Sequence, residues 1–206
     1  NSLYGGTYNL LANTLPRFGI TTTFVDPDNP DEFTKAIEPN TRLFFAESLG
    51  NPKLDVIDLK SISDAAKDAK VPFVVDNTVA SPALLNPIEH GANIVIHSLT
   101  KYLTGNGTSI GGVIIDAGTF NWANGNFPEF TEPNPSYHGL NYHEALGNIA
   151  FIAKVRIEGL RDLGSAPSPF NSFQSIQGIE TLDIRMKKHS ENALKLAAWL
   201  STKDEV

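Results

Sequence analysis

Residues 93–107 read NIVIHSLTKYLTGNG, an apolar run of strand character that ends in two hydroxyl residues, a lysine and a glycine-rich turn. A second apolar run, VPFVV at residues 71–75, ends in Asp76. Ligands of open parallel sheets bind beyond the carboxyl ends of the strands. We therefore expect the polar residues that follow both runs, Lys101 and Asp76 among them, to face one crevice.

The rest of the chain alternates short apolar runs with amphipathic segments. The apolar runs predict strands at 21–25, 41–46, 71–75, 93–101 and 110–115. Apolar residues three or four positions apart predict helices at 5–18, 31–37, 58–69, 144–163 and 180–200. This alternation predicts an α/β fold, with a three-layer, mostly parallel sheet covered by helices on both faces.

Two helices carry more detailed expectations. Pro16 should bend or end the first helix early, because proline removes a backbone donor. The last helix is expected to bury one stripe of residues, consisting of Leu182, Met186, His189, Ala193, Leu196 and Leu200. His97, on a strand, and His189 are expected to be structural rather than metal ligands.

The chain is expected to contain a large domain at residues 1–164. Residues 165–206 are expected to be a linker, with SAPSP at 165–169, and the start of a smaller C-terminal domain. Many aromatic residues lie among Gly, Asn and Pro between 116 and 142, which favours a functional loop over disorder. Because the sequence begins with Asn1 rather than Met and its first residues resemble an internal segment, we expect a fragment of a larger protein.

Composition excludes several classes of function. The 206 residues carry a net charge of −7 and no basic tract, so nucleic acids and anionic membranes are not expected partners. The absence of cysteine excludes disulfides and thiolate sites. No apolar run reaches the roughly 20 residues that span a bilayer, and no signal peptide opens the chain, so we expect a cytoplasmic protein. The five histidines lack zinc-site spacing, and no metal is predicted.

The expected crevice suits pyridoxal 5′-phosphate (PLP), a cofactor with an aldehyde, a basic ring nitrogen and a phosphate. Lys101 is expected at the end of an apolar strand with almost no polar spacer, where desolvation would favour a neutral, nucleophilic amine, although a single lysine is more often a solvated charge. Asp76 could pair with the ring nitrogen and keep it protonated, or simply cap the next helix. The combination of the two is more specific than either residue.

Four further residues are candidates for the same site. Ser98 and Thr100 alternate about one residue, so a strand would place their hydroxyls on one side for a phosphate; ordinary strand-edge hydroxyls are the alternative. Tyr4 could stack on a planar ring or bind an anion, and core packing is the alternative. Asn51 lies in a Gly-Asn-Pro turn at the same expected edge, where plain turn chemistry is the alternative.

Together these segments resemble the Cys/Met-metabolism family of PLP-dependent enzymes, relatives of cystathionine γ-synthase. The likeness rests on the order and spacing of LYGGT (3–7), ESLGNP (47–52), VVDNT (74–78), HSLTKYLTG (97–105) and GIETL (178–182). The aromatic segment resembles the O-acetylhomoserine sulfhydrylase branch through FNW (120–122), FP (127–128) and PSYHG (135–139). The resemblance implies the large domain of the aspartate aminotransferase-like fold, fold type I.

The resemblance also implies roles for individual residues. Lys101 would form the Schiff base with PLP and later move protons, and Asp76 would pair with the pyridine nitrogen. Ser98 and Thr100 would bind the phosphate. Tyr4 would stack on the ring, and Asn51 would form a hydrogen bond near the phenolic oxygen.

The implied reaction is a γ-replacement of methionine biosynthesis. It converts O-acetyl-L-homoserine and sulfide, or a thiol, to L-homocysteine, or methionine, and acetate in a dimer-based homotetramer. A γ-lyase of the same family, or an inactive PLP-binding fragment, is the alternative. The family's other phosphate-binding elements would lie before Asn1 and its substrate-carboxylate arginine beyond Val206, because Arg156, Arg161 and Arg185 do not match that arginine's motif.

Overall fold

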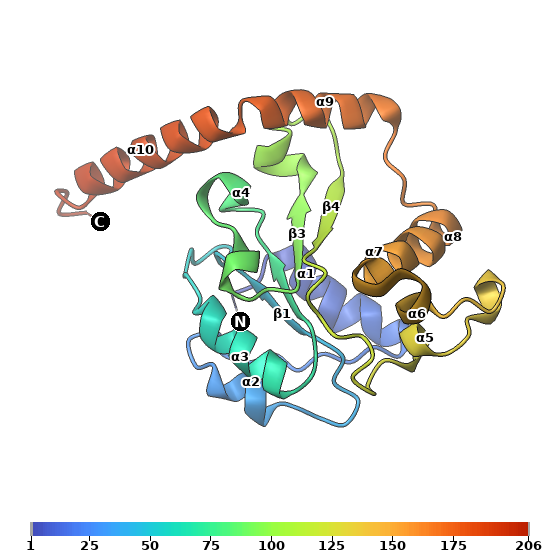
Figure 1. The fold of residues 1–206 in the computed structure, drawn as a ribbon. Helices are drawn as coiled ribbons and strands as arrows, with labels where there is room; N and C mark the ends of the chain where they lie inside the picture. Colours follow the sequence, from blue (N-terminus) through green and yellow to red (C-terminus); the bar gives the residue numbers. More distant parts are fainter. Residues whose placement is uncertain (1, 206) are drawn as a thin grey trace.

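The computed structural model describes residues 2–205, which fold around a four-stranded sheet. The strands run in the order β1 (Phe44–Glu47), β2 (Phe73–Asp76), β3 (Ile94–Ser98) and β4 (Gly112–Asp116) (Figure 1). The first three strands are parallel, and β4 runs antiparallel to β3. Glu47 pairs with Asp76, and Asp76 with Ile96, so the carboxyl ends of the parallel strands share one edge.

Ten α-helices in the described residues surround this sheet. They are α1 (Gly5–Asn9), α2 (Asp31–Lys35), α3 (Leu59–Asp68), α4 (Ser81–Leu84), α5 (Pro128–Thr131), α6 (Tyr142–Leu146), α7 (Ala150–Lys154), α8 (Arg161–Leu163), α9 (Pro169–Glu180) and α10 (Leu182–Leu200). Shorter 3₁₀ or π segments are η1 (Leu10–Thr14), η2 (Leu15–Phe18), η3 (Pro87–His90), η4 (Leu99–Leu103), η5 (Pro135–Tyr137), η6 (Gly147–Ile149) and η7 (Val155–Leu160).

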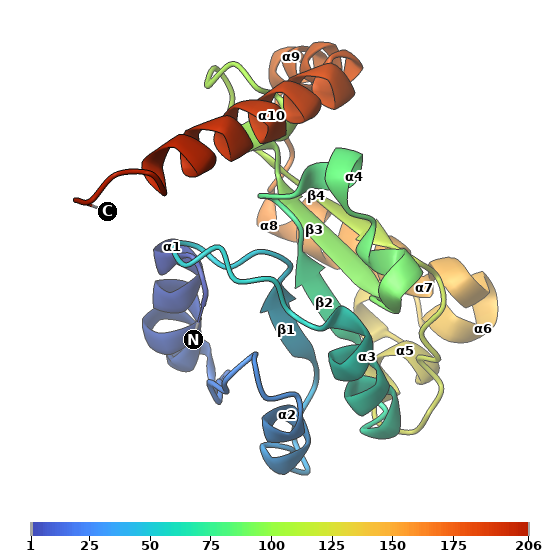
Figure 2. The same ribbon diagram turned by 90° about the vertical axis from the view of Figure 1, so that its left-hand side faces the viewer.

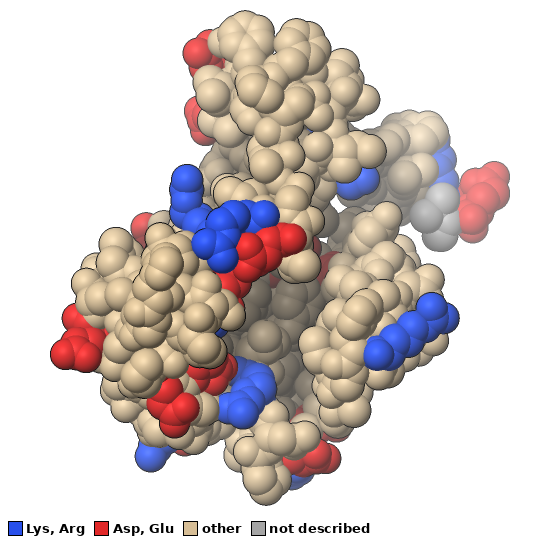
Figure 3. Space-filling view, turned by 90° about the vertical axis from the view of Figure 1, so that its right-hand side faces the viewer, with Lys and Arg blue, Asp and Glu red and all other residues tan. Residues whose placement is uncertain are grey.

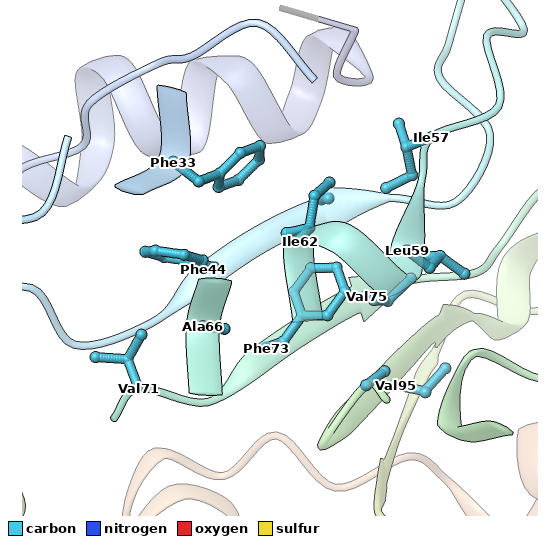
Figure 4. Close-up of a cluster of buried hydrophobic side chains, with 12 residues drawn as sticks. Phe33, Phe44, Ile57, Leu59, Ile62, Ala66, Val71, Phe73, Val75 and Val95 are labelled. Carbon is cyan, nitrogen blue, oxygen red and sulfur yellow. The ribbon is translucent and has the colours of Figure 1, made fainter. Parts of the chain in front are cut away.

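One face of the sheet packs against α3. The pleat directs Phe73 and Val75 of β2 to this face, where they meet Ile62 of α3 (Figure 4). Asp58 begins the helix by accepting the backbone N–H of Ser61 at 3.1 Å. Burial of these apolar side chains holds α3 on the sheet.

The opposite face is covered by the aromatic segment and the helices after it. Val74 and Ile94 pack there against Trp122. The rings of Trp122 and Phe151 stack with centroids 5.1 Å apart, so this segment is part of the core rather than a disordered loop. Figure 2 looks onto the sheet, with its four strands side by side, α3 in front of it and α7 and α8 behind it, which confirms the predicted three-layer α/β fold with a mostly parallel sheet.

Most predicted elements are present, with local differences. The helix at 5–18 continues from α1 through η1 to η2, where Pro16 begins a 3₁₀ turn. The helix predicted at 144–163 is divided at Gly147, whose φ of 53° does not fit an α-helix. The strand predicted at 21–25 was wrong. Strand propensity largely reflects side-chain packing on a sheet, and Phe24 packs on the Tyr8 ring instead.

The C-terminal helices differ most from expectation. The predicted linker at 165–169 is followed directly by α9, which the sequence reading missed. Leu182 and Met186 of α10 are buried, but His189, Ala193 and Leu196 are exposed, so the predicted stripe was wrong over most of its length. Figure 1 shows the reason: α10 crosses the sheet only near its start and then extends beyond it. The division into two domains stays a prediction.

Candidate functional site

The carboxyl ends of β2 and β3 are held together through Thr78. Its backbone N–H donates to Oδ1 of Asp76 at 2.9 Å, and its hydroxyl oxygen accepts the backbone N–H of Ser98 at 2.8 Å. These two bonds fix the Asp76 carboxylate relative to the residue with which β3 ends. The side chains of Asp76, Thr78 and Ser98 are all half-buried. Sequence reasoning placed Asp76 and Ser98 at one edge, and the structure brings them together there.

Lys101 lies in η4, the helical segment that begins directly after β3. The helical backbone is interrupted at Lys101 itself, where φ is −98° and ψ is −128°. Its side chain is exposed, so the desolvation expected from the sequence is not found in this structure. The strand ends at Ser98, three residues earlier, and the lysine therefore follows a turn rather than the strand.

Thr100 also lies in η4, so the argument that Ser98 and Thr100 alternate along one strand was wrong. The Thr100 hydroxyl contacts the backbone N–H and C=O of Gly111 at 3.3 and 3.4 Å, which joins η4 to the segment before β4. Both hydroxyl residues remain half-buried at the carboxyl end of β3. Their assignment to a phosphate stays a prediction.

Tyr4 reaches the same edge from the start of the chain. Its backbone N–H donates to Oε1 of Glu47, at the end of β1, at 2.7 Å. Tyr4 is 50% exposed, and its ring lies over the first turn of α1. A Cβ on Gly6 would sit 2.6 Å from Cε1 of that ring, so glycine allows the ring to lie there. The alternative of core packing is therefore wrong for Tyr4.

Asn51 follows β1 in an exposed turn at this edge. The preceding Gly50 packs so closely against Ser2 that a Cβ at Gly50 would lie 2.8 Å from the Ser2 carbonyl oxygen. This contact holds the N-terminal segment that carries Tyr4 beside the turn that carries Asn51. The chain thus brings Tyr4, Asn51, Asp76 and Ser98 to one edge of the sheet.

Glu47 is a site residue that sequence reasoning missed. Its side chain is only 7% exposed, and burial raises its pKa to about 6. Backbone N–H groups of Tyr4 and Asn51 act in the opposite direction, whereas the carboxylates of Asp76 and Asp55 raise it further. The signal was available, because Glu47 ends an apolar run just as Asp76 does.

His97 is buried, as expected of a structural histidine, and lies one residue before the end of β3. Burial lowers its pKa, and the Asn77 carbonyl and the Asp76 carboxylate oppose that shift. Asn77 is itself fixed, since its Oδ1 accepts the Ser48 hydroxyl at 2.7 Å and its amide donates to the Leu85 carbonyl at 2.8 Å. His189 is exposed and contacts the Tyr102 ring instead.

The residues at this edge fit PLP chemically. Asp76 offers a half-buried carboxylate whose Oδ2 has no hydrogen-bond partner among the described residues, as a protonated ring nitrogen requires. Ser98 supplies a hydroxyl, Tyr4 a half-exposed ring, and Lys101 an accessible amine. Within residues 2–205, no cluster of three or more metal-ligating side chains is present. The described helices include none that is long and apolar enough to cross a membrane.

Other surface features lie elsewhere. A hollow of about 620 Å³ is lined by eight residues between 133 and 145, none of them a predicted site residue. On the face in Figure 3, Lys and Arg are interspersed with Asp and Glu rather than gathered into one basic patch. Neither feature lies at the sheet edge where the Asp76 carboxylate and the Ser98 residue come together through Thr78.

The chain is similar to known proteins over nearly its whole length. The model of the Cys/Met metabolism PLP-dependent enzyme family matches residues 1–206. An O-acetyl-L-homoserine sulfhydrylase of Leptospira meyeri is 59% identical over 97% of this chain and 47% of its own length. A homocysteine synthase of Schizosaccharomyces pombe is 48% identical over 99% of this chain and 48% of its own length. This chain therefore spans about half the length of the curated relatives it matches.

Solved structures give the same result. A Campylobacter jejuni structure described as an O-acetylhomoserine (thiol)-lyase superposes with a TM-score of 0.95 at 42% identity, covering 99% of this chain and 51% of that one. That structure contains a pyridoxyl-lysine phosphate. An O-acetylhomoserine sulfhydrylase of Wolinella succinogenes superposes with a TM-score of 0.85 at 36% identity, covering 99% of this chain and 56% of that one.

Proposed function

Because this chain belongs to the Cys/Met metabolism family of PLP-dependent enzymes, we propose that it is the cofactor-binding core of an O-acetylhomoserine sulfhydrylase. The reaction would replace the acetate of O-acetyl-L-homoserine with sulfide, or with a thiol, and release L-homocysteine, or methionine. The observation that carries the proposal is the pair of bonds through Thr78, which fixes Asp76 beside the segment leading to Lys101.

Bound PLP would supply an electron sink for negative charge at the α-carbon of the substrate. The Lys101 amine would hold the cofactor covalently and, once displaced by substrate, accept the α-proton and help to move a β-proton. The Asp76 carboxylate would keep the ring nitrogen protonated, and the protein would contribute orientation and field.

The other residues would hold the cofactor in place. Ser98 and Thr100 would donate hydroxyl hydrogens to the phosphate. Tyr4 would stack on the ring, and the Asn51 amide would donate near the phenolic oxygen. The half-exposed ring of Tyr4 and the exposed Asn51 are available for these contacts.

We also propose that the protein is cytoplasmic, that its substrate is a small amino acid, and that it assembles as a dimer-based homotetramer. The support for this proposal is the similarity of the sequence to biosynthetic enzymes. The finding that none of the described helices could span a membrane agrees with this placement.

A labelling experiment tests the lysine assignment. We expect that PLP followed by borohydride places a pyridoxyl group on Lys101, detected by peptide mass spectrometry, and that Lys101→Ala loses it. Exposed Lys53→Ala, in the turn after β1, is the control and should keep the label on Lys101. Equal labelling of that peptide region in Lys101→Ala would contradict the assignment.

Product analysis tests the reaction class. With O-acetyl-L-homoserine and sulfide, the complete protein should form homocysteine and acetate in equal amounts. Net formation of 2-oxobutanoate and ammonia as the main products would instead identify a γ-lyase.

A further inference from the structure

The Arg185 side chain, at the start of α10, binds the segment that follows Lys101. Nη1 donates to the carbonyl of Tyr102 at 2.8 Å, and Nη2 is 3.4 Å from the carbonyl of Leu103. Nη2 also donates to the carbonyl of Gly178, near the end of α9, at 2.7 Å. Nε donates to the Thr181 hydroxyl at 3.1 Å. One guanidinium therefore joins η4 to the junction of α9 and α10.

These carbonyls are good partners for a cation. The last carbonyl groups of a helical segment, such as those of Tyr102 and Leu103 in η4, tend to lack intrahelical donors and carry partial negative charge. Arginine presents several N–H groups in a planar fork and can satisfy separate acceptors at once, whereas lysine offers a single point charge. The Lys101 carbonyl lies in the same turn, where it accepts the Gly105 N–H at 2.8 Å.

Close packing between α9 and the backbone at Thr104 adds to these hydrogen bonds. A Cβ on Gly178 would lie 2.1 Å from the Thr104 carbonyl oxygen, so α9 approaches this backbone as closely as only glycine allows. The buried hydroxyls of Thr104 and Ser175 form a hydrogen bond at 2.9 Å. Figure 1 shows α9 and α10 crossing the molecule near the end of β3 and the start of β4, and η4 follows β3 directly.

We propose that Arg185 is a positioning residue that holds the backbone on the C-terminal side of Lys101 and thereby sets the direction in which the Lys101 amine is presented to the cofactor. The inference rests on the proposed function, since it requires Lys101 to be the cofactor lysine. Arg185 acts here mainly through backbone carbonyls, because three of its four contacts go to carbonyl oxygens and the fourth goes to the Thr181 hydroxyl. It is not assigned to a substrate carboxylate.

The test compares Arg185→Gln and Arg185→Lys with a matched control, Arg161→Gln, in the complete protein. Arg161 is exposed and pairs with its neighbour Asp162. We expect Arg185→Gln to slow borohydride-fixed labelling of Lys101 at saturating PLP by roughly tenfold, the effect of losing one or two charge-assisted hydrogen bonds. The PLP concentration for half-maximal labelling should change less than about twofold, because the phosphate contacts remain.

The conservative variant and the control sharpen the test. Arg185→Lys should recover part of the rate, and Arg161→Gln should label like wild type. In protein without PLP, amide hydrogen exchange over residues 99–105 should be faster in Arg185→Gln than in wild type or Arg161→Gln, because this backbone loses the hydrogen bonds from the guanidinium.

Each outcome decides the inference. Wild-type labelling rates in a folded Arg185→Gln protein would overturn it, as would a change in half-maximal PLP concentration alone. If Arg185→Gln does not fold, Arg185→Lys decides: a wild-type rate overturns the inference, and a rate reduced severalfold supports it. Absence of label on Lys101 in the wild type would overturn the proposed function as well, whereas wild-type labelling with an unchanged Arg185→Gln overturns only the role of Arg185.

Discussion

The hydroxyl oxygen of Thr78 accepts the backbone N–H of Ser98 at 2.8 Å, and this bond ties the residues after β2 to the end of β3. Thr78 also donates its own N–H to Asp76, so one residue touches both sides of the candidate site. Its position is decided by two parallel strands in register, with Asp76 opposite Ile96. Thr78 therefore sets the spacing between the Asp76 carboxylate and Ser98.

Replacing Thr78 tests this spacing. Thr78→Val keeps the shape of the side chain but leaves the Ser98 N–H without its acceptor, which should cost about 1–3 kcal/mol of unfolding free energy. Thr78→Ser keeps the acceptor and should lose under about 1 kcal/mol. Urea denaturation measures both. Equal stability of the valine and serine variants would mean that the bond contributes nothing.

Glu47 predicts a pH dependence of stability. Its folded pKa of about 6 lies above the ordinary value of 4.5, so the folded state binds the proton more tightly than the unfolded chain. The resulting stabilisation is complete below about pH 4.5 and is lost as the pH rises through 6. A shift of this size corresponds to about 2 kcal/mol. Glu47→Gln should lack this loss in urea denaturation measured between pH 4.5 and 7.

The same window contains an opposite effect from His97. Burial lowers its pKa, so His97 contributes stability above pH 6.5 that is lost as the pH falls through its folded pKa. Subtracting the Glu47→Gln curve from the wild-type curve removes the His97 contribution, which both proteins share. The exposed Glu180→Gln variant is the control and should keep the wild-type slope. Parallel curves for wild type and Glu47→Gln would contradict the prediction.

Gly178 predicts a strong effect from one added methyl group. In Gly178→Ala the new Cβ would lie 2.1 Å from the Thr104 carbonyl oxygen and must displace backbone, which should cost about 1–3 kcal/mol. Gly159→Ala is a matched control, because a Cβ there meets only Val155, at 3.9 Å. The control should be neutral or slightly stabilising, since alanine favours helix. The prediction fails if thermal unfolding shifts both midpoints alike.

The two tryptophans offer a test of the aromatic core. Trp122 is 4% exposed and packs in the layer that covers Val74 and Ile94, so Trp122→Ala should cost about 3–5 kcal/mol. Trp199, on α10, is 55% exposed, and Trp199→Ala should cost under about 1 kcal/mol. Urea denaturation followed by far-ultraviolet circular dichroism compares them. Similar losses in both would show that the segment does not carry the core.

Much of the fold could be predicted from local chemistry. The runs that became β1 to β3 are apolar because strands buried on both faces need apolar residues almost throughout, and the spacing in α3 is that of one buried helical face. The polar residues at the ends of these runs indicated the edge at which Asp76 and Ser98 lie. These are short-range patterns, so they can be recognised in a single sequence.

Tertiary structure alone decided the features that depend on distant partners. Glu47 joins the site because β1 lies beside β2, and Arg185 acquires its partners because α10 crosses η4, 82 or 83 residues away in sequence. The segment at 21–25 has strand composition but packs on Tyr8, and most of the predicted stripe on α10 lies beyond the sheet. The sequence by itself determined which residues could bury or react. Which of them meet was decided by the packing of elements far apart in the chain.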